Sequence, residues 1–72
     1  MNLAGRHPST VAVARFYAYD HLPLRLQGIS KACHDLCDEM LGVLPDDPEL
    51  TAGLRKLLEA KDCFVRLAAV KE

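Results

Sequence analysis

Residues 45–48 read Pro45-Asp46-Asp47-Pro48 and separate two long stretches whose apolar residues recur three or four positions apart. Proline disrupts the interior of a helix, so this segment ends one helix and begins the next. Asp47 is expected to cap the second helix, with Pro48 at its first position and Glu49 in its first turn. Because the connection is short, the helices are predicted to fold back as an antiparallel hairpin.

The helices on either side of this turn are predicted over residues 30–44 and 48–71. Ser30 is expected to be the N-cap of the first helix. The helical period of the apolar residues predicts the side that each helix buries. These core positions are Ile29, Cys33, Leu36, Cys37, Met40, Val43 and Leu44 in the first stretch, and Leu50, Leu54, Leu57, Leu58, Phe64, Val65 and Ala68 in the second.

The residues ahead of the hairpin are predicted as a variable arm over residues 1–15 and a short helix with a kink over residues 16–29. Ser9 or Thr10 is a candidate cap for a short helix in the arm, although the alternation that follows also fits a strand. Pro23 suits the first turn of a helix, and Gly28 is expected to interrupt it. The predicted fold is therefore all-α, with residues 1–72 forming one helical hairpin domain.

The composition indicates that this domain does not stand alone. The chain has 72 residues, and half of them are apolar. A chain this short buries only about 60% of the surface that it exposes when unfolded, so small domains usually need a disulfide, a metal or a partner chain. Two helices cannot bury so many apolar side chains by themselves. We therefore expect a homo-oligomer.

The charge balance excludes one class of partner. Lys and Arg together number 9 and Asp and Glu 10, which gives a net charge of −1. Proteins that bind DNA normally carry an excess of basic residues, because phosphate neutralisation drives that binding. A small ligand with one to three phosphates needs only a few well-placed cations. On this charge balance we expect no DNA as a partner. We also expect no membrane, because no segment has the apolar length of a bilayer span.

Three cysteines suggest metal or thiol chemistry, but plainer interpretations fit better. An odd cysteine count without a secretory leader indicates free thiols in a reducing compartment. Cys33, His34 and Cys37 offer only part of the four-ligand set of a structural zinc site, and the two cysteines also fall on the apolar stripe. Cys63 or Cys37 beside His34 is a conceivable nucleophile, but nothing supplies an oxyanion hole. We expect neither a metal, nor another cofactor, nor an enzyme.

The antiparallel geometry brings polar and aromatic residues together at the open end of the hairpin. Ser30 and Lys31 are expected to lie beside residues 64–66, and the segment that carries Tyr17 and Tyr19 enters at the same end. Free N–H groups at a helix start, a hydroxyl and an ammonium group can cradle a phosphate, and a tyrosine face can stack on a purine base. The plainer alternatives are a solvated pair between Lys31 and Asp35 and tyrosines that fill the core.

Five stretches within residues 16–65 form an ordered set: Phe16-x-x-Tyr19, His21-Leu22-Pro23-x-x-Leu26-Gln27-x-x-Ser30-Lys31, His34-Asp35-Leu36, Leu44-Pro45-Asp46 and Glu49-x-Thr51-x-Gly53-Leu54-Arg55-Lys56-Leu57-Leu58-Glu59-Ala60-Lys61-Asp62. No single stretch is catalytic, and only the ordered set is specific. With this set, residues 16–65 resemble a family of small phage proteins, the anti-CBASS and anti-Thoeris sponges, which share a helical hairpin domain and sequester cyclic nucleotide signals of bacterial immunity. Residues 1–15 do not align with that family.

The resemblance implies a compact homo-oligomer, a hexamer in the anti-CBASS branch, that binds its ligands intact between subunits. It implies that Tyr19 stacks on a base and that Lys31 holds a phosphate. It also suggests Arg66, late in the last helix, for a second pocket that takes cyclic trinucleotides. Tyr17 is an additional candidate for base stacking.

From these observations we expect a phage protein of the host-cell cytoplasm that binds cyclic dinucleotides, and also cyclic trinucleotides, to block CBASS-type defence. The candidate ligand-binding residues are Tyr17, Tyr19, Ser30, Lys31, Arg55 and Arg66. Two alternatives remain open. One is a sponge for cyclic ADP-ribose-type signals of Thoeris, and the other is a structural helical module that only assembles subunits or binds a partner protein.

Overall fold

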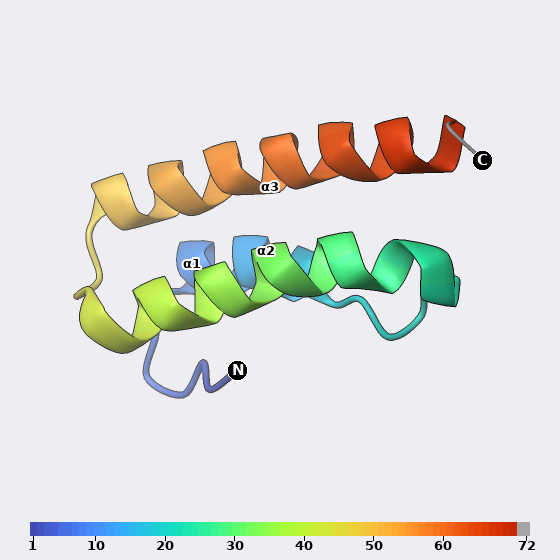
Figure 1. Ribbon diagram of the computed structural model, residues 1–72. Helices are drawn as coiled ribbons and strands as arrows, with labels where there is room; N and C mark the ends of the chain where they lie inside the picture. Colours follow the sequence, from blue (N-terminus) through green and yellow to red (C-terminus); the bar gives the residue numbers. More distant parts are fainter. Residues whose placement is uncertain (71–72) are drawn as a thin grey trace.

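The computed structural model describes residues 1–70, and within them every regular element is a helix. The chain order is α1 (Pro8–Ala14), the 3-10 helix η1 (Arg15–Tyr17), α2 (Leu24–Val43) and α3 (Pro48–Val70). Figure 1 shows α2 and α3 running antiparallel, with α1 behind α2. The predicted all-α hairpin is thus confirmed, while residue 71 of the predicted last helix lies outside the described residues.

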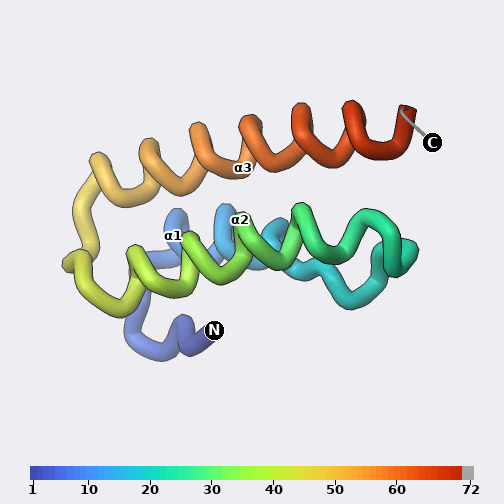
Figure 2. The backbone as a smooth tube through the Cα atoms, in the orientation of Figure 1, coloured from blue at the N-terminus to red at the C-terminus, as the bar shows by residue number. Residues whose placement is uncertain are grey.

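The turn between α2 and α3 forms as its sequence predicts. Leu44 adopts an extended backbone conformation and ends α2. The Asp47 carboxylate accepts a hydrogen bond of 2.9 Å from the backbone N–H of Glu49, which caps α3. Pro48 occupies the first position of α3 and Glu49 lies in its first turn. The path of the chain through this turn is clearest in the tube of Figure 2.

The first long helix begins at Leu24, so the predicted start at Ser30 and the predicted kink at Gly28 are wrong. The backbone N–H groups of Leu26 and Gln27 both donate to the carbonyl of Pro23, which is the N-cap residue. Gly28 costs a helix about 1 kcal/mol relative to alanine. Burial of the Leu26 side chain, which is 7% exposed, offsets that cost because it packs the first turns onto the rest of the protein.

The predicted variable arm contains α1, whose cap is His7 rather than Ser9 or Thr10. The His7 ring nitrogen Nδ1 accepts a hydrogen bond from the backbone N–H of Ser9, and Pro8 follows the cap directly. α1 packs mainly on α3, and η1 packs on α2. Val13 and Tyr17 contribute from these segments to the buried core, whose other members are Cys33, Cys37, Leu41, Leu50 and Leu54.

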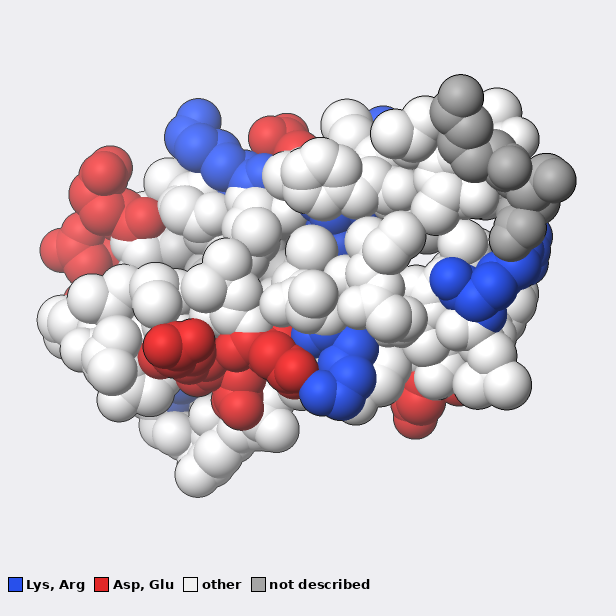
Figure 3. Space-filling model, in the orientation of Figure 1, with Lys and Arg blue, Asp and Glu red and all other residues white. Residues whose placement is uncertain are grey.

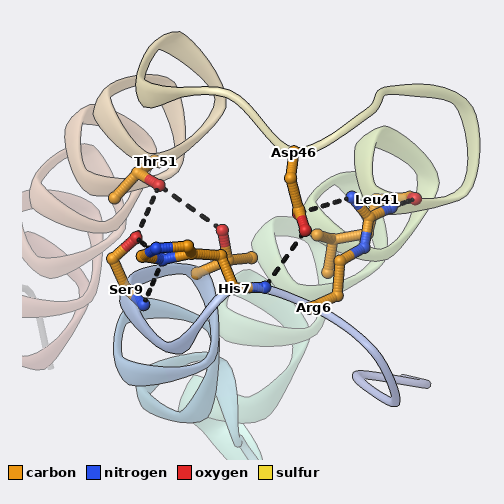
Figure 4. Close-up of polar contacts among 7 residues, drawn as sticks. Arg6, His7, Ser9, Leu41, Asp46 and Thr51 are labelled. Atoms are coloured by element: carbon orange, nitrogen blue, oxygen red, sulfur yellow. Dashed lines mark hydrogen bonds and ion pairs between the residues drawn. The ribbon is translucent and has the colours of Figure 1, made fainter.

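The N-terminal segment is attached to the hairpin turn by polar contacts (Figure 4). The Arg6 guanidinium lies 3.0 Å from one oxygen of Asp46, and the backbone N–H of His7 donates to the other at 3.1 Å. The hydroxyls of Ser9 and Thr51 are 3.3 Å apart. The Arg6 guanidinium holds the pKa of the Asp46 carboxyl below its usual value. These contacts hold α1 in place over one face of the hairpin.

Candidate functional site

A pocket of about 390 Å³ opens at the end of the hairpin away from the turn, and we call it the end pocket. Four segments line it: η1, the connection before α2, α2 itself and α3 from Leu58 onward. The antiparallel hairpin predicted that polar and aromatic residues meet at this end, and of the residues expected there the pocket contains Ser30, Val65 and Arg66. The lining residues are Arg15, Phe16, Ala18, His21, Leu22, Ser30, Leu58, Lys61, Asp62, Val65 and Arg66.

Lys61 is a buried cation at the base of this pocket. Its side chain is only 10% exposed, which is uncommon for lysine because the charged form loses hydration. The ammonium nitrogen Nζ donates a hydrogen bond of 2.8 Å to the backbone carbonyl of Phe16. It lies 6.0 Å from the centre of the Tyr17 ring and 4.0 Å from a carboxylate oxygen of Asp62. The carbonyl therefore fixes the position of the ammonium group, while the carboxylate lies beyond hydrogen-bonding distance.

Ser30 lines the same pocket from the interior of α2, and its side chain is fully buried. Within residues 1–70, its hydroxyl oxygen has no hydrogen-bond partner. Buried hydroxyls are nearly always bonded, so an unpaired one indicates a missing water, ion or ligand. The expected phosphate cradle of Ser30 and Lys31 at a helix start is wrong, because α2 begins six residues earlier and Ser30 is not at its start. The Ser30 hydroxyl instead lies beside the cationic residues of the end pocket.

Two arginines and an aromatic ring complete the pocket wall. Arg66 is exposed on α3, with its guanidinium 3.4 Å from the sulfur of Cys63. The Arg15 guanidinium lies 5.1 Å from the centre of the Phe16 ring, which is within range of a cation–π interaction. Phe16 is 55% exposed. The pocket therefore combines several cationic groups with apolar wall, an arrangement that suits an anion carrying a planar apolar group.

Tyr17 does not belong to this surface, so its expected role in base stacking is wrong. Its side chain is completely buried, and the phenol hydroxyl donates a hydrogen bond to the backbone carbonyl of Leu54. Burial, with smaller contributions from neighbouring acidic groups, raises the pKa of the Tyr17 phenol far above its ordinary value. Tyr17 fills the core, as the plainer alternative predicted.

Tyr19 and Lys31 lie outside the end pocket, on the surface of the molecule. The Tyr19 ring contacts the His34 ring edge-to-face at 5.1 Å between centroids. Lys31 forms an ion pair of 2.6 Å with Asp35, one turn further along α2. That hydrogen bond raises the pKa of Lys31 and lowers the pKa of Asp35. The solvated pair on α2 is confirmed, since Lys31 and Asp35 are both exposed, whereas Tyr19 and His34 are half-buried.

Of the six candidate residues, the structure brings only Ser30 and Arg66 to the end pocket. Arg55 is exposed on α3 and does not line it. Arg15, Phe16, Lys61 and Asp62 were missed as site residues. One signal for Lys61 was present in the sequence, because it continues the apolar series Leu54, Leu58, Val65 and Ala68 at helical spacing and so falls on the buried side of α3.

The cysteines Cys33 and Cys37 are buried in the core as free thiols, whereas Cys63 is exposed. Burial raises the pKa of the Cys37 thiol to about 11. Among residues 1–70, no group of three or more His, Cys, Asp or Glu side chains is placed to hold a metal ion. The preferred interpretation of Cys33 and Cys37 as small core residues is confirmed.

A second hollow, of about 410 Å³, lies beside the hairpin turn. Its hydroxyls face one another, with 3.4 Å between those of Thr10 and Thr51. The carboxylates of Asp46 and Asp47 also line it, so its charge disfavours an anionic ligand. The end pocket is therefore the better candidate for a phosphate-bearing ligand.

The face of the hairpin opposite α1 is apolar and uncovered, and we call it the open face. Leu36, Met40, Leu44, Gly53 and Leu57 line a shallow groove of about 290 Å³ there. Phe64 and Leu67 extend the same stripe along α3 and are 53% and 57% exposed. Figure 3 shows a largely uncharged band between α2 and α3, with acidic side chains gathered toward the turn.

No protein-family model, curated protein or solved structure matches this chain. None of the helices within residues 1–70 combines the length and the apolar character that crossing a bilayer requires.

Proposed function

We propose that this protein binds small phosphate-bearing molecules in the end pocket and holds them unchanged, as a sponge for cyclic oligonucleotide signals. The observation that carries this proposal is that one pocket is lined by two unusual residues: Lys61, whose ammonium group is buried, and Ser30, whose hydroxyl has no hydrogen-bond partner within residues 1–70. In keeping with the resemblance, the ligands are cyclic dinucleotides or trinucleotides of CBASS-type immunity, and the protein acts in the cytoplasm of an infected bacterial cell.

The groups of the end pocket are suited to hold a phosphate at low ordering cost. Lys61 is already fixed by the carbonyl of Phe16, so its ammonium needs no further ordering when a ligand binds. Arg15 and Arg66 supply further positive charge on the pocket wall, and the buried Ser30 hydroxyl reaches a phosphate oxygen only when the side chains over it move aside. The volume lies at the lower end of the range of about 300–1,000 Å³ for small-molecule sites, which suits part of a cyclic dinucleotide.

Binding without chemistry follows from the same groups. A serine nucleophile requires an adjacent base to accept its proton. Within residues 1–70 the Ser30 hydroxyl has no hydrogen-bond partner, so neither His21 nor Asp62, which line the same pocket, is bonded to it as a base. The ligand should therefore leave the pocket intact.

Titration calorimetry with a panel of cyclic dinucleotides, cyclic trinucleotides and cyclic ADP-ribose-type molecules tests the proposal. Arg66→Gln should weaken binding of the preferred ligand about ten- to one-hundred-fold, the range of a charge-assisted hydrogen bond. Arg55→Gln is the matched control, because Arg55 is also an exposed arginine of α3 but lies outside the pocket. Ligand released by heating should be chromatographically unchanged. A folded protein that gives no heat with any member of the panel would refute the proposal.

The panel also separates the sponge for CBASS signals from the alternative sponge for Thoeris signals. Preference for cyclic ADP-ribose-type molecules would assign the protein to the second class. In both cases the binding site is the same, because each ligand carries phosphates and a purine base.

The open face supports a second part of the proposal, assembly into a homo-oligomer, and the resemblance favours a hexamer. Monomeric proteins seldom leave so continuous an apolar stripe in water. Phe64→Asp should dissociate the assembly in analytical ultracentrifugation, toward the mass of one 8.0 kDa chain. Leu24→Asp is the matched control, because Leu24 is 84% exposed but lies away from this stripe. Wild-type protein that sediments as a monomer would refute assembly.

The same face favours the alternative of a purely structural module, in which assembly is the whole function. That alternative gives no role to the unpartnered Ser30 hydroxyl beside the buried Lys61 ammonium. Ligand-dependent melting distinguishes the two functions, since a ligand that binds only the folded state raises the midpoint of thermal unfolding.

A further inference from the structure

Asp62 is the acidic side chain in a pocket whose other charged residues are cations. It lines the end pocket from α3 and is about half exposed. Its nearer carboxylate oxygen lies 4.0 Å from the Lys61 ammonium, which is already bonded to the carbonyl of Phe16. Asp62 therefore does not neutralise Lys61 through a hydrogen bond, and its oxygens retain acceptor capacity at the pocket wall.

A carboxylate works against an anionic ligand unless that ligand also presents hydrogen-bond donors. Repulsion from a phosphate would otherwise weaken binding. In a nucleotide, the donors are the N–H groups of the base and the hydroxyls of the ribose. Of the two purines, guanine presents two adjacent N–H donors on its Watson–Crick edge, which a carboxylate can accept together. Adenine presents one donor beside an acceptor nitrogen that a carboxylate repels.

The pocket also holds a surface on which a purine can stack. Phe16 lines it with a ring that is more than half exposed, and the Arg15 guanidinium lies over that ring. Phe16 and Asp62 line the same pocket, and Lys61 lies between their segments, with its ammonium bonded to the Phe16 backbone carbonyl and 4.0 Å from the Asp62 carboxylate. Stacking on an aromatic residue is tolerant of base identity, so selectivity has to come from the polar group beside it.

We propose that Asp62 makes the end pocket selective for guanine, with the base stacked on Phe16 and its Watson–Crick edge bonded to the Asp62 carboxylate. This inference rests on the proposed function and names the ligand class within it: cyclic dinucleotides that contain at least one guanine. Asp62 is then the specificity-determining residue, while Ser30, Lys61 and Arg66 hold phosphate of either purine ligand.

Calorimetric titration of wild type and Asp62→Asn with cyclic di-GMP and cyclic di-AMP tests this selectivity. Wild type should prefer cyclic di-GMP by roughly 5- to 150-fold, the discrimination given by a bidentate contact to a base edge. Asp62→Asn should lose most of that preference by weakening cyclic di-GMP alone. Affinity for cyclic di-AMP should stay level or rise, because a negative charge near its phosphates is removed. Glu59→Gln is the control, an equal change of charge on α3 outside the pocket.

The possible failures can be told apart. If both ligands bind wild type equally, the guanine inference is overturned while the proposed function stands. If Asp62→Asn weakens both ligands equally, the carboxylate bonds ribose hydroxyls that the two ligands share, and the guanine inference is again overturned. If neither ligand binds, and circular dichroism shows that the protein is folded, the guanine inference is refuted. The proposed binding of cyclic dinucleotides by this protein is then refuted as well.

Discussion

Replacing Tyr17 by phenylalanine should destabilise the protein at neutral pH. The difference in stability between the variant and the wild type should disappear in alkaline solution. Tyr17 is completely buried, and its hydroxyl donates to the backbone carbonyl of Leu54 in α3. Tyr17→Phe keeps the ring in the core and removes only this hydrogen bond. An intramolecular hydrogen bond of this kind contributes about 0.5–1.5 kcal/mol, so the variant should be less stable by about that amount at pH 7.

The pH dependence follows from the raised pKa of the buried phenol. In the unfolded chain Tyr17 ionises near its ordinary value of 10.0, whereas burial keeps it protonated in the folded protein well above that pH. The folded state therefore binds more protons than the unfolded state, and stability falls as the pH rises above about 10. At pH 11 the wild type loses about 1.4 kcal/mol through this group. The variant has no such loss, so the two unfolding free energies should meet between about pH 10 and pH 11, where that loss equals the contribution of the hydrogen bond.

Urea unfolding followed by circular dichroism at 222 nm, at fixed protein concentration between pH 7 and pH 11, measures this difference. All other ionisable groups are shared by the two proteins, so their contributions cancel when the variant is subtracted from the wild type. A difference that stays constant from pH 9 to pH 11 would show that Tyr17 is not the buried, protonated group described above.

Three further predictions concern single side chains. Ser30→Ala should leave the unfolding free energy unchanged or raise it by up to about 1 kcal/mol, because the lost hydroxyl has no partner within residues 1–70; a clear fall in urea unfolding experiments would contradict this. A thiol reagent at pH 8 should label Cys63 rapidly and the two core cysteines only after unfolding, as counted by mass spectrometry. Asp46→Asn should speed exchange of the His7 amide hydrogen at neutral pH. That difference should vanish in acid as the pH falls through the lowered pKa of Asp46, because the wild-type carboxylate is then protonated.

The hairpin could be predicted from sequence because its determinants are local. Pro45, Asp47 and Pro48 act on the backbone within a few residues, and a period of three or four does not depend on what the helix packs against. Long-range packing decided the parts that sequence missed. The start of α2 was misplaced because the burial of Leu26, which is 7% exposed, outweighs the cost of Gly28.

The sequence predicted where the candidate site lies, but it predicted only some of the residues that line it. Antiparallel helices require their far ends to meet, so the location of the end pocket follows from topology alone. Which side chains face it depends on the rotation of each helix, and a start of α2 at Leu24 changed the environment of Ser30 from a helix end to a buried position. Lys61 was missed because a lysine in an apolar series is usually solvated, and its burial depends on the backbone carbonyl of Phe16, which lies in a distant part of the sequence.

The position of α1 decides which surfaces of the hairpin are available to a ligand and which are available to other subunits of the proposed oligomer. α1 and the segment after it occupy one flank of the hairpin, and the end pocket is built partly from that segment. The groove on the other flank is lined by α2 and α3 without them. In the proposed assembly, subunits that met through this second flank would leave the pocket entrance of each copy uncovered, so ligand would enter and leave every copy without dissociation of the oligomer.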